Sequence, residues 1–196
     1  MDWKLHQTQI AYDGHFKVTK YELSHEKYSG ENTPVLHREL VSRDDSVAMV
    51  AYDPESDELV MVEQFRIGAI REDQPWLIEI VAGLIESGES AEQVTIRESQ
   101  EEIGCTPLEL IKIGEFYTSP GGVSEWVHLY MGKVSVKEIN AVGGLEHEGE
   151  DIKILVVPAS DAEFMLSTGE VRSAIAIIGL QWFVINKENI RKQWLS

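Results

Sequence analysis

The strongest constraint on the fold of this chain is a switch from a strand pattern to a helix pattern within residues 76–104. Residues 76–83, WLIEIVAG, form an apolar run that ends in glycine and is typical of a strand. Ser90 followed by Gln93 is a capping-box arrangement, and helix-forming residues continue up to Gly104, which stands where a helix-ending glycine belongs. The segment therefore predicts a strand, a loop and a helix in direct succession.

Apolar runs on both sides of this segment predict a strand-rich body. The runs SVAMVAYD (46–53) and ELVMVEQF (58–65) are separated by DPES, which is a hairpin signal. A strand-rich chain with a few helices in mixed order predicts an α+β fold or an α/β/α sandwich, and argues against a doubly wound nucleotide-binding fold. The other expected elements are strands over 16–23, 35–41, 108–116, 125–134 and 152–158, a connection over 137–144, a short helix capped by Ser160 that stops near Gly169, and a C-terminal helix over about 172–186.

The first 45 residues are expected to be a β-rich extension of a main domain formed by residues 46–196. The two strands expected there, 16–23 and 35–41, are too small to make a stable core alone. This region must therefore pack on the rest of the chain or on a second copy of it.

Composition excludes several classes of function. The chain has 196 residues and a formal net charge of −17, so it repels nucleic-acid backbones and anionic lipid surfaces. Cys105 is its single cysteine, which rules out an intrachain disulfide framework and fits a reducing compartment. The start, MDWKLHQTQI, carries charges where a signal peptide needs an apolar run, and no apolar run approaches the ~18–20 residues that span a bilayer. We expect a cytoplasmic protein.

The predicted helix concentrates carboxylates on one side. Glu98 and Glu102 are i,i+4 neighbours, and Glu101 lies three residues after Glu98. Like charges at this spacing repel one another, and Arg97 compensates one charge at most. A solvated acidic face is the simple interpretation in a chain this acidic. A divalent cation is the functional one, and hard oxygen ligands favour Mg²⁺, with Mn²⁺ as a possible substitute.

The order of residues around these glutamates favours the functional interpretation. Gly83, Glu89 and the run from Arg97 to Gly104, RESQEEIG, match the Nudix box in spacing throughout, and the chain resembles the Nudix hydrolases. One departure is Ser99, where the family usually places an aliphatic or other small apolar residue. The resemblance implies a mixed sheet between helices, with the box as a loop–helix–loop. It also implies metal-dependent hydrolysis of a nucleoside diphosphate linked to another moiety.

The resemblance also implies roles for residues of the box. Glu98 and Glu102 are expected to be the core metal ligands, with Glu101 in support and the main-chain carbonyl of Ala82 beside them. Arg97 is expected to orient the glutamates, and we count Glu101 and Arg97 with the catalytic residues.

Other motifs resemble the ADP-ribose pyrophosphatase branch of the family. Pro120, in TSPGGVSE (118–125), follows the box at the distance that marks this branch, and EQFRIGAI (63–70) and GLQWF (179–183) resemble it too. The branch implies hydrolysis of ADP-ribose to AMP and ribose 5-phosphate. A GDP-mannose or other nucleotide-sugar pyrophosphatase remains the alternative, because SPGGVSE recurs there. A non-catalytic nucleotide-binding regulator is disfavoured, because such binders tend to lose box glutamates.

Outside the box, the resemblance implies further site residues and a partner. In the acidic loop GLEHEGEDIKI (144–154), Glu148 is expected to be the general base and Glu150 an additional metal ligand. The branch also forms homodimers in which N-terminal strands of one subunit complete the pocket of the other, and a homodimer is expected here. The expected substrate-binding residues are Arg66 for the diphosphate, Phe16, Arg38 and Trp76 for the adenine or its ribose, and Glu125 for the terminal ribose.

Overall fold

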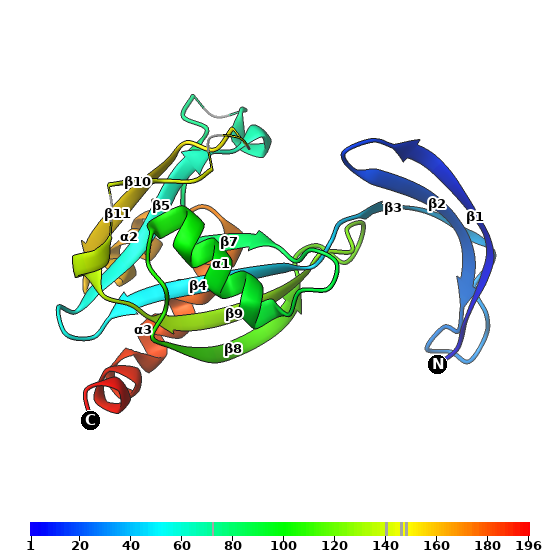
Figure 1. Cartoon of the computed structure of the whole chain (residues 1–196). Coiled ribbons are helices and arrows are strands. Elements are labelled where there is room, and N and C mark those ends of the chain that lie inside the picture. Colours follow the sequence, from blue (N-terminus) through cyan, green and yellow to red (C-terminus); the bar gives the residue numbers. More distant parts are fainter. Residues whose placement is uncertain (72, 140, 146, 148) are drawn as a thin grey trace. The chain divides into compact units, whose positions relative to one another are not determined.

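The structure is a computed structural model that describes residues 1–71, 73–139, 141–145, 147 and 149–196 (Figure 1). The chain divides into two compact units, which are treated separately below. Unit 1 comprises residues 1–45 and 117–126, and unit 2 comprises residues 46–116 and 127–196. Among the described helices, none is long and apolar enough to cross a membrane.

The described residues form strands joined by α-helices and short 3₁₀ turns. The strands are β1 (Trp3–Asp13), β2 (Lys17–His25), β3 (Leu36–Ser42), β4 (Ser46–Asp53), β5 (Glu58–Phe65), β6 (Trp76–Glu79), β7 (Val81–Leu84), β8 (Glu109–Tyr117), β9 (Trp126–Lys133), β10 (Val142–Gly143) and β11 (Ile152–Pro158). The helices are α1 (Ala91–Ile103), α2 (Asp161–Thr168) and α3 (Ala174–Trp194), with 3₁₀ turns η1 (Ile67–Ala69) and η2 (Val136–Glu138).

Unit 2 is built on a mixed sheet. Within the described residues, its strands lie in the order β10-β11-β5-β4-β9-β8, while β6 pairs with β5 and β7 pairs with β4. Strand β4 is parallel to β9 and antiparallel to β5 and β7. The sheet therefore combines both strand directions, as expected for an α+β fold.

The centre of the sheet is a fork between β4 and β5. These strands pair with each other only through Ala51–Asp53 and Glu58–Val60, near the turn that joins them. Beyond this, β4 pairs with β7 through Ser46–Met49, and β5 pairs with β6 through Val62–Phe65. The segment 76–84 therefore fills the fork, which places its polar groups at the middle of the sheet.

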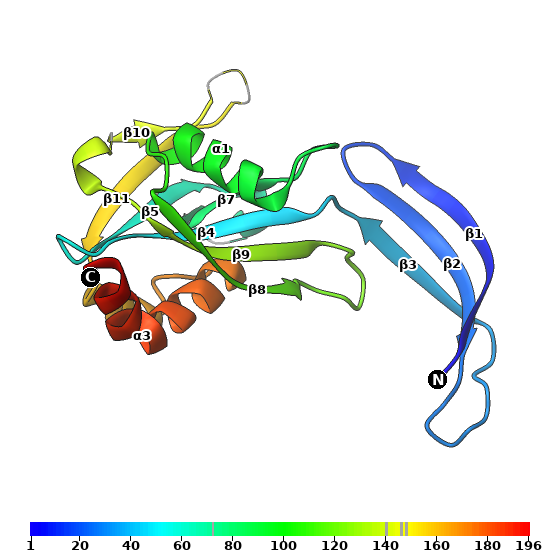
Figure 2. The same cartoon turned by 60° about the horizontal axis from the view of Figure 1, so that its bottom comes forward.

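Helices cover both faces of this sheet. Helix α1 lies on one face, and α3 with α2 lies on the other (Figures 1 and 2). Successive side chains of β4 point to opposite faces of the sheet. Val50 and Tyr52 pack in the apolar cluster with α3, whereas Met49 and Ala51 pack in the cluster with α1. A strand buried on both faces must be apolar throughout, which explains its sequence. The predicted α/β/α arrangement is confirmed.

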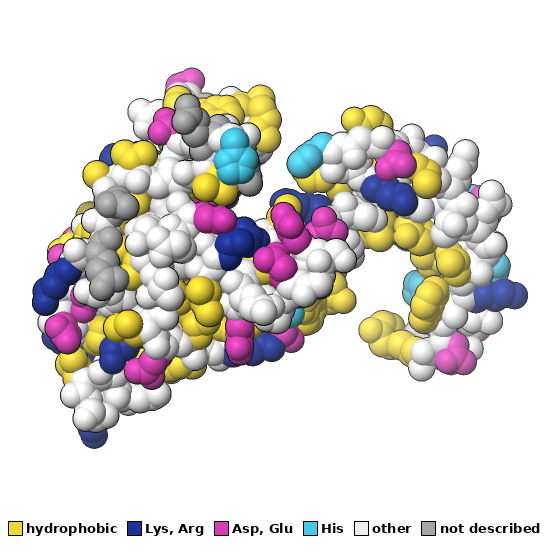
Figure 3. Space-filling model, in the orientation of Figure 1, with side chains coloured by type: hydrophobic (Ala, Val, Ile, Leu, Met, Phe, Trp, Pro, Cys, Tyr) yellow, Lys and Arg dark blue, Asp and Glu magenta, His cyan; other side chains and the backbone are white. Residues whose placement is uncertain are grey.

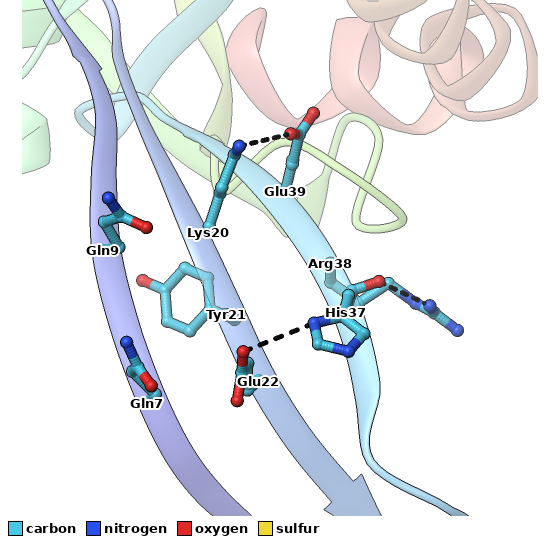
Figure 4. A pocket seen from close by; sticks show the side chains of 8 residues that line it. All are labelled: Gln7, Gln9, Lys20, Tyr21, Glu22, His37, Arg38 and Glu39. Atoms are coloured by element: carbon cyan, nitrogen blue, oxygen red, sulfur yellow. Dashed lines mark hydrogen bonds and ion pairs between the residues drawn. The ribbon is translucent and has the colours of Figure 1, made fainter.

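Unit 1 is a three-stranded antiparallel sheet, β1-β2-β3, in the described chain. Its two faces differ in character. On one face, paired residues bring apolar side chains together: Leu5 opposes Leu23, which opposes Leu36. The other face carries the polar residues that line a hollow of about 510 Å³ (Figure 4), among them Gln7, Gln9, Lys20, Glu22, His37 and Glu39.

The structure differs from the sequence expectations in several elements. The single strand expected over 76–83 is two strands, β6 and β7, because the segment changes its pairing partner from β5 to β4. The connection expected over 137–144 contains the short strand β10. Strand β1 was not predicted, because its register slips between Leu5 and Gln7 and between Ile10 and Tyr12, which interrupts the alternation of apolar residues. Helix α3 continues to Trp194 instead of ending near residue 186. Ser160 makes no side-chain cap to α2, because it already has helical backbone angles.

Asp57 joins the β4–β5 turn to helix α3. Its carboxylate accepts hydrogen bonds from Tyr52 Oη at 2.7 Å and Lys187 Nζ at 2.8 Å, and lies 3.4 Å from Arg191 Nη1. Its φ of 60° is in the left-handed region, which Asp and Asn tolerate better than most residues. Although burial opposes it, hydrogen bonds from Lys187 and Tyr52 hold the pKa of Asp57 below its usual value.

We expect Asp57→Asn to lower the free energy of unfolding by about 1–3 kcal/mol, because the charge is lost while the backbone preference is kept. A carboxyl group with a lowered pKa stabilises the protein above its unfolded pKa and loses that effect as the pH falls. The difference between wild type and variant in urea unfolding should therefore be full at pH 7 and shrink below about pH 4. A difference that stays constant across this range would contradict the assigned ion pair.

Candidate active site

Helix α1 begins and ends where the sequence predicts. Ser90 Oγ accepts a hydrogen bond from Gln93 N at 3.3 Å, and Gln93 Oε1 accepts one from Ser90 N at 2.9 Å, which completes the capping box. Gly104 ends the helix with a φ of 69°, a conformation that glycine adopts without strain. These two signals fix where α1 begins and ends, and its buried residues, among them Val94 and Ile103, define the face that meets the sheet.

A serine anchors the far end of this helix. Ser99 is fully buried, and its hydroxyl donates to the carbonyl oxygen of Cys105 at 2.6 Å. The departure from the usual Nudix pattern is therefore accommodated by a hydrogen bond in place of an apolar contact.

Glycines allow the box helix to approach the strands. A Cβ on Gly83 of β7 would collide with the carboxyl group of Glu98, and one on Gly143 of β10 would collide with the backbone carbonyl of Glu102. Both positions therefore need glycine for close approach. The result is that α1 carries its glutamates directly against β7 and β10.

Glu102 is the most deeply buried carboxylate of the cluster, with 2% of its surface exposed. Burial raises the pKa of Glu102 to about 8, and the charges of Glu98 and Glu150 add to the rise. The N–H of Ala82, which donates to Glu102 Oε2 at 3.1 Å, and the charge of Arg66 lower the pKa in part. Glu102 therefore lies near Glu98, Glu150 and Ala82, the residues that are expected with it in the site.

Glu98 shares this environment. Burial raises the pKa of Glu98 to about 7, and the nearby charges of Glu101 and Glu150 act in the same direction. Arg97 opposes this shift through its own charge and its hydrogen bond. Removing a proton from Glu98 thus costs free energy unless another cation is present.

Arg97 holds the surrounding carboxylates. Its Nη1 donates to Glu98 Oε1 at 2.9 Å and to Glu101 Oε2 at 2.8 Å, while its Nε donates to Glu89 Oε1 at 3.2 Å. Figure 3 shows carboxylate side chains around a basic one on the face of unit 2 that carries α1. This is the geometry that an orienting arginine would make.

The acidic loop is tied to the end of α1. Gly144 N donates to Glu101 O at 2.9 Å, and Leu145 N donates to Glu150 Oε2 at 3.1 Å. These bonds place Glu150 beside the box carboxylates. Glu148, the predicted base, lies outside the described residues.

Arg66 and Trp76 lie where β5 and β6 pair. Arg66 Nε donates to Glu79 Oε2 at 2.7 Å, and Trp76 packs edge-on against Phe65 with ring centroids 5.6 Å apart. Glu79 is not predicted from the sequence, because its pairing with Arg66 follows from the β5–β6 register. No spacing along the chain signals it.

The other predicted substrate residues belong to unit 1. The ring of Phe16 lies 5.6 Å from the guanidinium of Arg43, and Arg38 Nη1 donates to the carbonyl oxygen of His37 at 2.8 Å. Glu125 is buried and accepts a hydrogen bond from Thr118 Oγ1 at 3.0 Å. Their roles toward a substrate remain predictions.

The carboxylates of unit 2 suit a divalent cation in their chemistry. Within the described part of the chain, no three acidic, histidine or cysteine side chains already converge as a metal cluster. Glu98, Glu102 and Glu150 nevertheless offer hard oxygen donors in one mutually repelling group, in which Glu102 is buried and the other two are partly exposed. The raised pKa values of Glu98 and Glu102 reflect an electrostatic cost that a bound cation would offset, so these residues fit such an ion.

Comparison with known proteins identifies the family of this chain. The NUDIX domain family matches residues 42–175, and the chain belongs to the Nudix family of hydrolases. Two relatives are named ADP-ribose pyrophosphatase. The Haemophilus influenzae protein is 37% identical over 95% of this chain and 88% of its own length, and the Escherichia coli K12 protein is 34% identical over 95% and 90%.

Two further similarities extend the comparison. A GDP-mannose pyrophosphatase of Enterobacter sp. strain 638 is 36% identical over 76% of this chain and 78% of its own length. A solved structure described as an ADP compounds hydrolase aligns over 97% of both chains with a TM-score of 0.75. At 18% identity, that structure shows the fold alone.

In the metal-free protein, we expect stability to fall as the pH rises from about 5 to 9. A carboxyl group whose folded pKa is raised binds its proton more tightly in the native state, so its contribution is full below the unfolded pKa and is lost through the folded pKa of about 8. Glu102→Gln should reduce this decline in the free energy of unfolding by on the order of a few kcal/mol. Thermal melts at each pH, with a chelator present to keep the protein metal-free, measure the difference. An equally steep decline in the variant would show that Glu102 does not titrate in this way.

Proposed function

We propose that this protein hydrolyses the diphosphate linkage of ADP-ribose to give AMP and ribose 5-phosphate, with Mg²⁺ as its ion. The observation that carries the proposal is the group of carboxylates formed by Glu98, the deeply buried Glu102 and Glu150 beside Ala82, all within the matched family region. The names of the similar proteins from Haemophilus influenzae and Escherichia coli supply the substrate.

The residues that would hold the ion are those that the sequence implies. Glu98, Glu102, Glu101 and Glu150 would supply carboxylate oxygens, and Ala82 its main-chain carbonyl. When bound, Mg²⁺ reverses the repulsion between these carboxylates and a diphosphate and lowers the pKa of a bound water, and Mn²⁺ can substitute for it. Arg97 keeps Glu98 and Glu101 oriented through the two hydrogen bonds described above.

The remaining roles follow the same proposal. Glu148 takes the proton of the attacking water, from an acidic loop that the bond of Gly144 N to Glu101 O ties to the box helix. Arg66 contacts the diphosphate through guanidinium donors that its bond to Glu79 leaves available. Phe16, Arg38 and Trp76 bind the adenosine end, and Glu125 binds the terminal ribose.

A GDP-mannose pyrophosphatase activity is the second candidate. It rests on the similarity to the Enterobacter protein of that name. The box carboxylates serve either substrate equally, because they contact only the diphosphate and its ion. The choice between the two substrates must therefore come from residues outside the box that contact the base and the sugar.

With Mg²⁺, the purified protein should release AMP from ADP-ribose faster than it cleaves GDP-mannose, ADP-glucose, NADH or dGTP, as measured by chromatography of the products. Glu98→Gln should reduce this turnover by at least ~10²-fold, because it removes a ligand of the ion. Glu92→Gln, an exposed carboxylate in the first turn of the same helix, should leave it unchanged.

Each departure from this result has a definite meaning. Faster cleavage of GDP-mannose would support the proposed reaction but make GDP-mannose the preferred substrate. Binding of ADP-ribose without any cleavage would favour a regulator. An equal loss of turnover in Glu98→Gln and Glu92→Gln would show that Glu98 contributes only to the net negative charge of the helix and is not a specific ligand of the ion.

We also propose that the protein is a homodimer whose second copy covers the apolar face of unit 1. That face comprises Leu5, Ile10, Leu23, Leu36 and Leu40, and Figure 3 shows apolar side chains along this sheet. Both buried apolar clusters found among the described residues belong to unit 2, so unit 1 has no comparable core. A sheet of this size needs a cover over its apolar face to be stable.

Light scattering should give the mass of a dimer at micromolar concentration. The double variant Leu5→Asp/Ile10→Asp should shift it to the monomer, because both side chains lie on the apolar face and are about half exposed within one chain, at 43% and 52%. Gln7→Asp/Gln9→Asp adds the same charge to the polar face of the same strand and should remain dimeric. A monomeric wild type, or equal dissociation of both variants, would refute the assigned interface.

A further inference from the structure

Glu79 is a charged residue in the middle of the sheet of unit 2, on the same face as the box carboxylates. It pairs directly with Val62 of β5, and Val62 packs in the apolar cluster with Ile103 of α1. Because directly opposed residues share a face of the sheet, the side chain of Glu79 points to the side that carries α1. That side chain is 13% exposed. A carboxylate so placed costs free energy unless a cation compensates it.

Arg66 supplies this compensation from the end of β5. It follows Val62 by four residues with an extended backbone, so its side chain begins on the same face of the sheet. Its Nε donates to Glu79 Oε2 at 2.7 Å. The side chain of Arg66 is 43% exposed, against 13% for Glu79, so the ion pair reaches from the interior of the sheet to its surface.

The arginine is held at both ends of its side chain. Arg66 N donates to Pro75 O at 3.0 Å and Ala69 N donates to Arg66 O at 2.9 Å, which fixes the backbone on either side. Glu79 fixes the other end through Nε alone, and within the described part of the chain Nη1 and Nη2 make no hydrogen bond. Because the guanidinium is a planar fork, these two nitrogens form an outer edge that can donate to two oxygens at once.

The box carboxylates compete with Glu79 for this guanidinium. The charge of Arg66 already acts on Glu102, which also feels the charges of Glu98 and Glu150. An arginine without a partner of its own would be drawn onto this negative group and would turn its donors away from a substrate. The charge-assisted bond from Glu79 opposes that movement and keeps Arg66 beside the group.

We propose that Glu79 is a positioning residue, which holds Arg66 so that the outer edge of its guanidinium faces the diphosphate of the substrate. This role rests on the proposed function, in which Arg66 contacts that diphosphate. Glu79 contacts no reacting atom and acts through Arg66. Removing Glu79 should therefore matter only while Arg66 is present.

A double-mutant cycle measured by steady-state kinetics with Mg²⁺ and ADP-ribose tests this dependence. Glu79→Gln should lower kcat/KM by about 10-fold or more, because it keeps the size of the side chain but loses the charge that holds Arg66 in place. In an Arg66→Ala background, the same substitution should change kcat/KM by less than about 2-fold. Glu79→Asp keeps the charge and should retain more activity than Glu79→Gln.

Glu63→Gln is the matched control. Glu63 also lies on β5 and forms an ion pair across the sheet, with Lys153 Nζ at 3.1 Å, but it is not part of the site. Its loss should leave kcat/KM unchanged. Melting curves of all variants establish that they fold, and Glu79→Asp takes the place of Glu79→Gln in the cycle if the latter does not.

Three results would overturn the role of Glu79. These are an unchanged kcat/KM in Glu79→Gln, an equal loss with and without Arg66, which would indicate a structural role, and an equal loss in Glu63→Gln, which would indicate an effect of net charge.

A failure of the proposed function gives a different result. If the wild type prefers GDP-mannose, the cycle is measured with that substrate, which has the same diphosphate. If the wild type cleaves neither, the proposed function fails, and the calorimetric affinity for ADP-ribose with Mg²⁺ replaces kcat/KM in the same cycle. Absence of both cleavage and binding would refute the role of Glu79 together with the proposed function.

Discussion

The site depends on the burial of Glu102 between helix α1 and strand β7. Its carboxylate faces the N–H of Ala82, but one neutral donor does not offset the cost of burying a charge near Glu98 and Glu150. The glycines at positions 83 and 143 make this close packing possible. The protein thus keeps together a group of carboxylates whose charges are unfavourable unless a proton or a cation joins them.

The fork in the sheet explains why the carboxylates, with their electrostatic cost, are gathered at the middle of unit 2. Because β4 and β5 diverge, β6 and β7 enter between them and bring Ala82 and Glu79 to the middle of unit 2. Glu102 from α1 meets Ala82 there, and Arg66 from the end of β5 meets Glu79. Negative and positive groups are thereby placed near each other on a rigid frame, as recognition of a diphosphate with its ion requires.

The proposals for the two units rest on different physical effects. In unit 2, carboxylates are concentrated around α1, and this concentration of negative charge favours a ligand of the opposite sign. In unit 1, apolar side chains share one face of a sheet that has no core of its own. That face favours a protein surface, because the hydrophobic effect has no preference for charge.

The sequence by itself determined the class of fold, the box helix with both its ends, and the candidate carboxylates, because capping, periodicity and i,i+4 spacing are local properties. The strands of the central sheet were also predictable, since burial on both faces makes them continuously apolar. Only the tertiary structure decided that Glu79 meets Arg66, that Ser99 bonds Cys105, and that Ala82 meets Glu102. These contacts depend on strand register and on how α1 packs against the sheet, which no local pattern encodes.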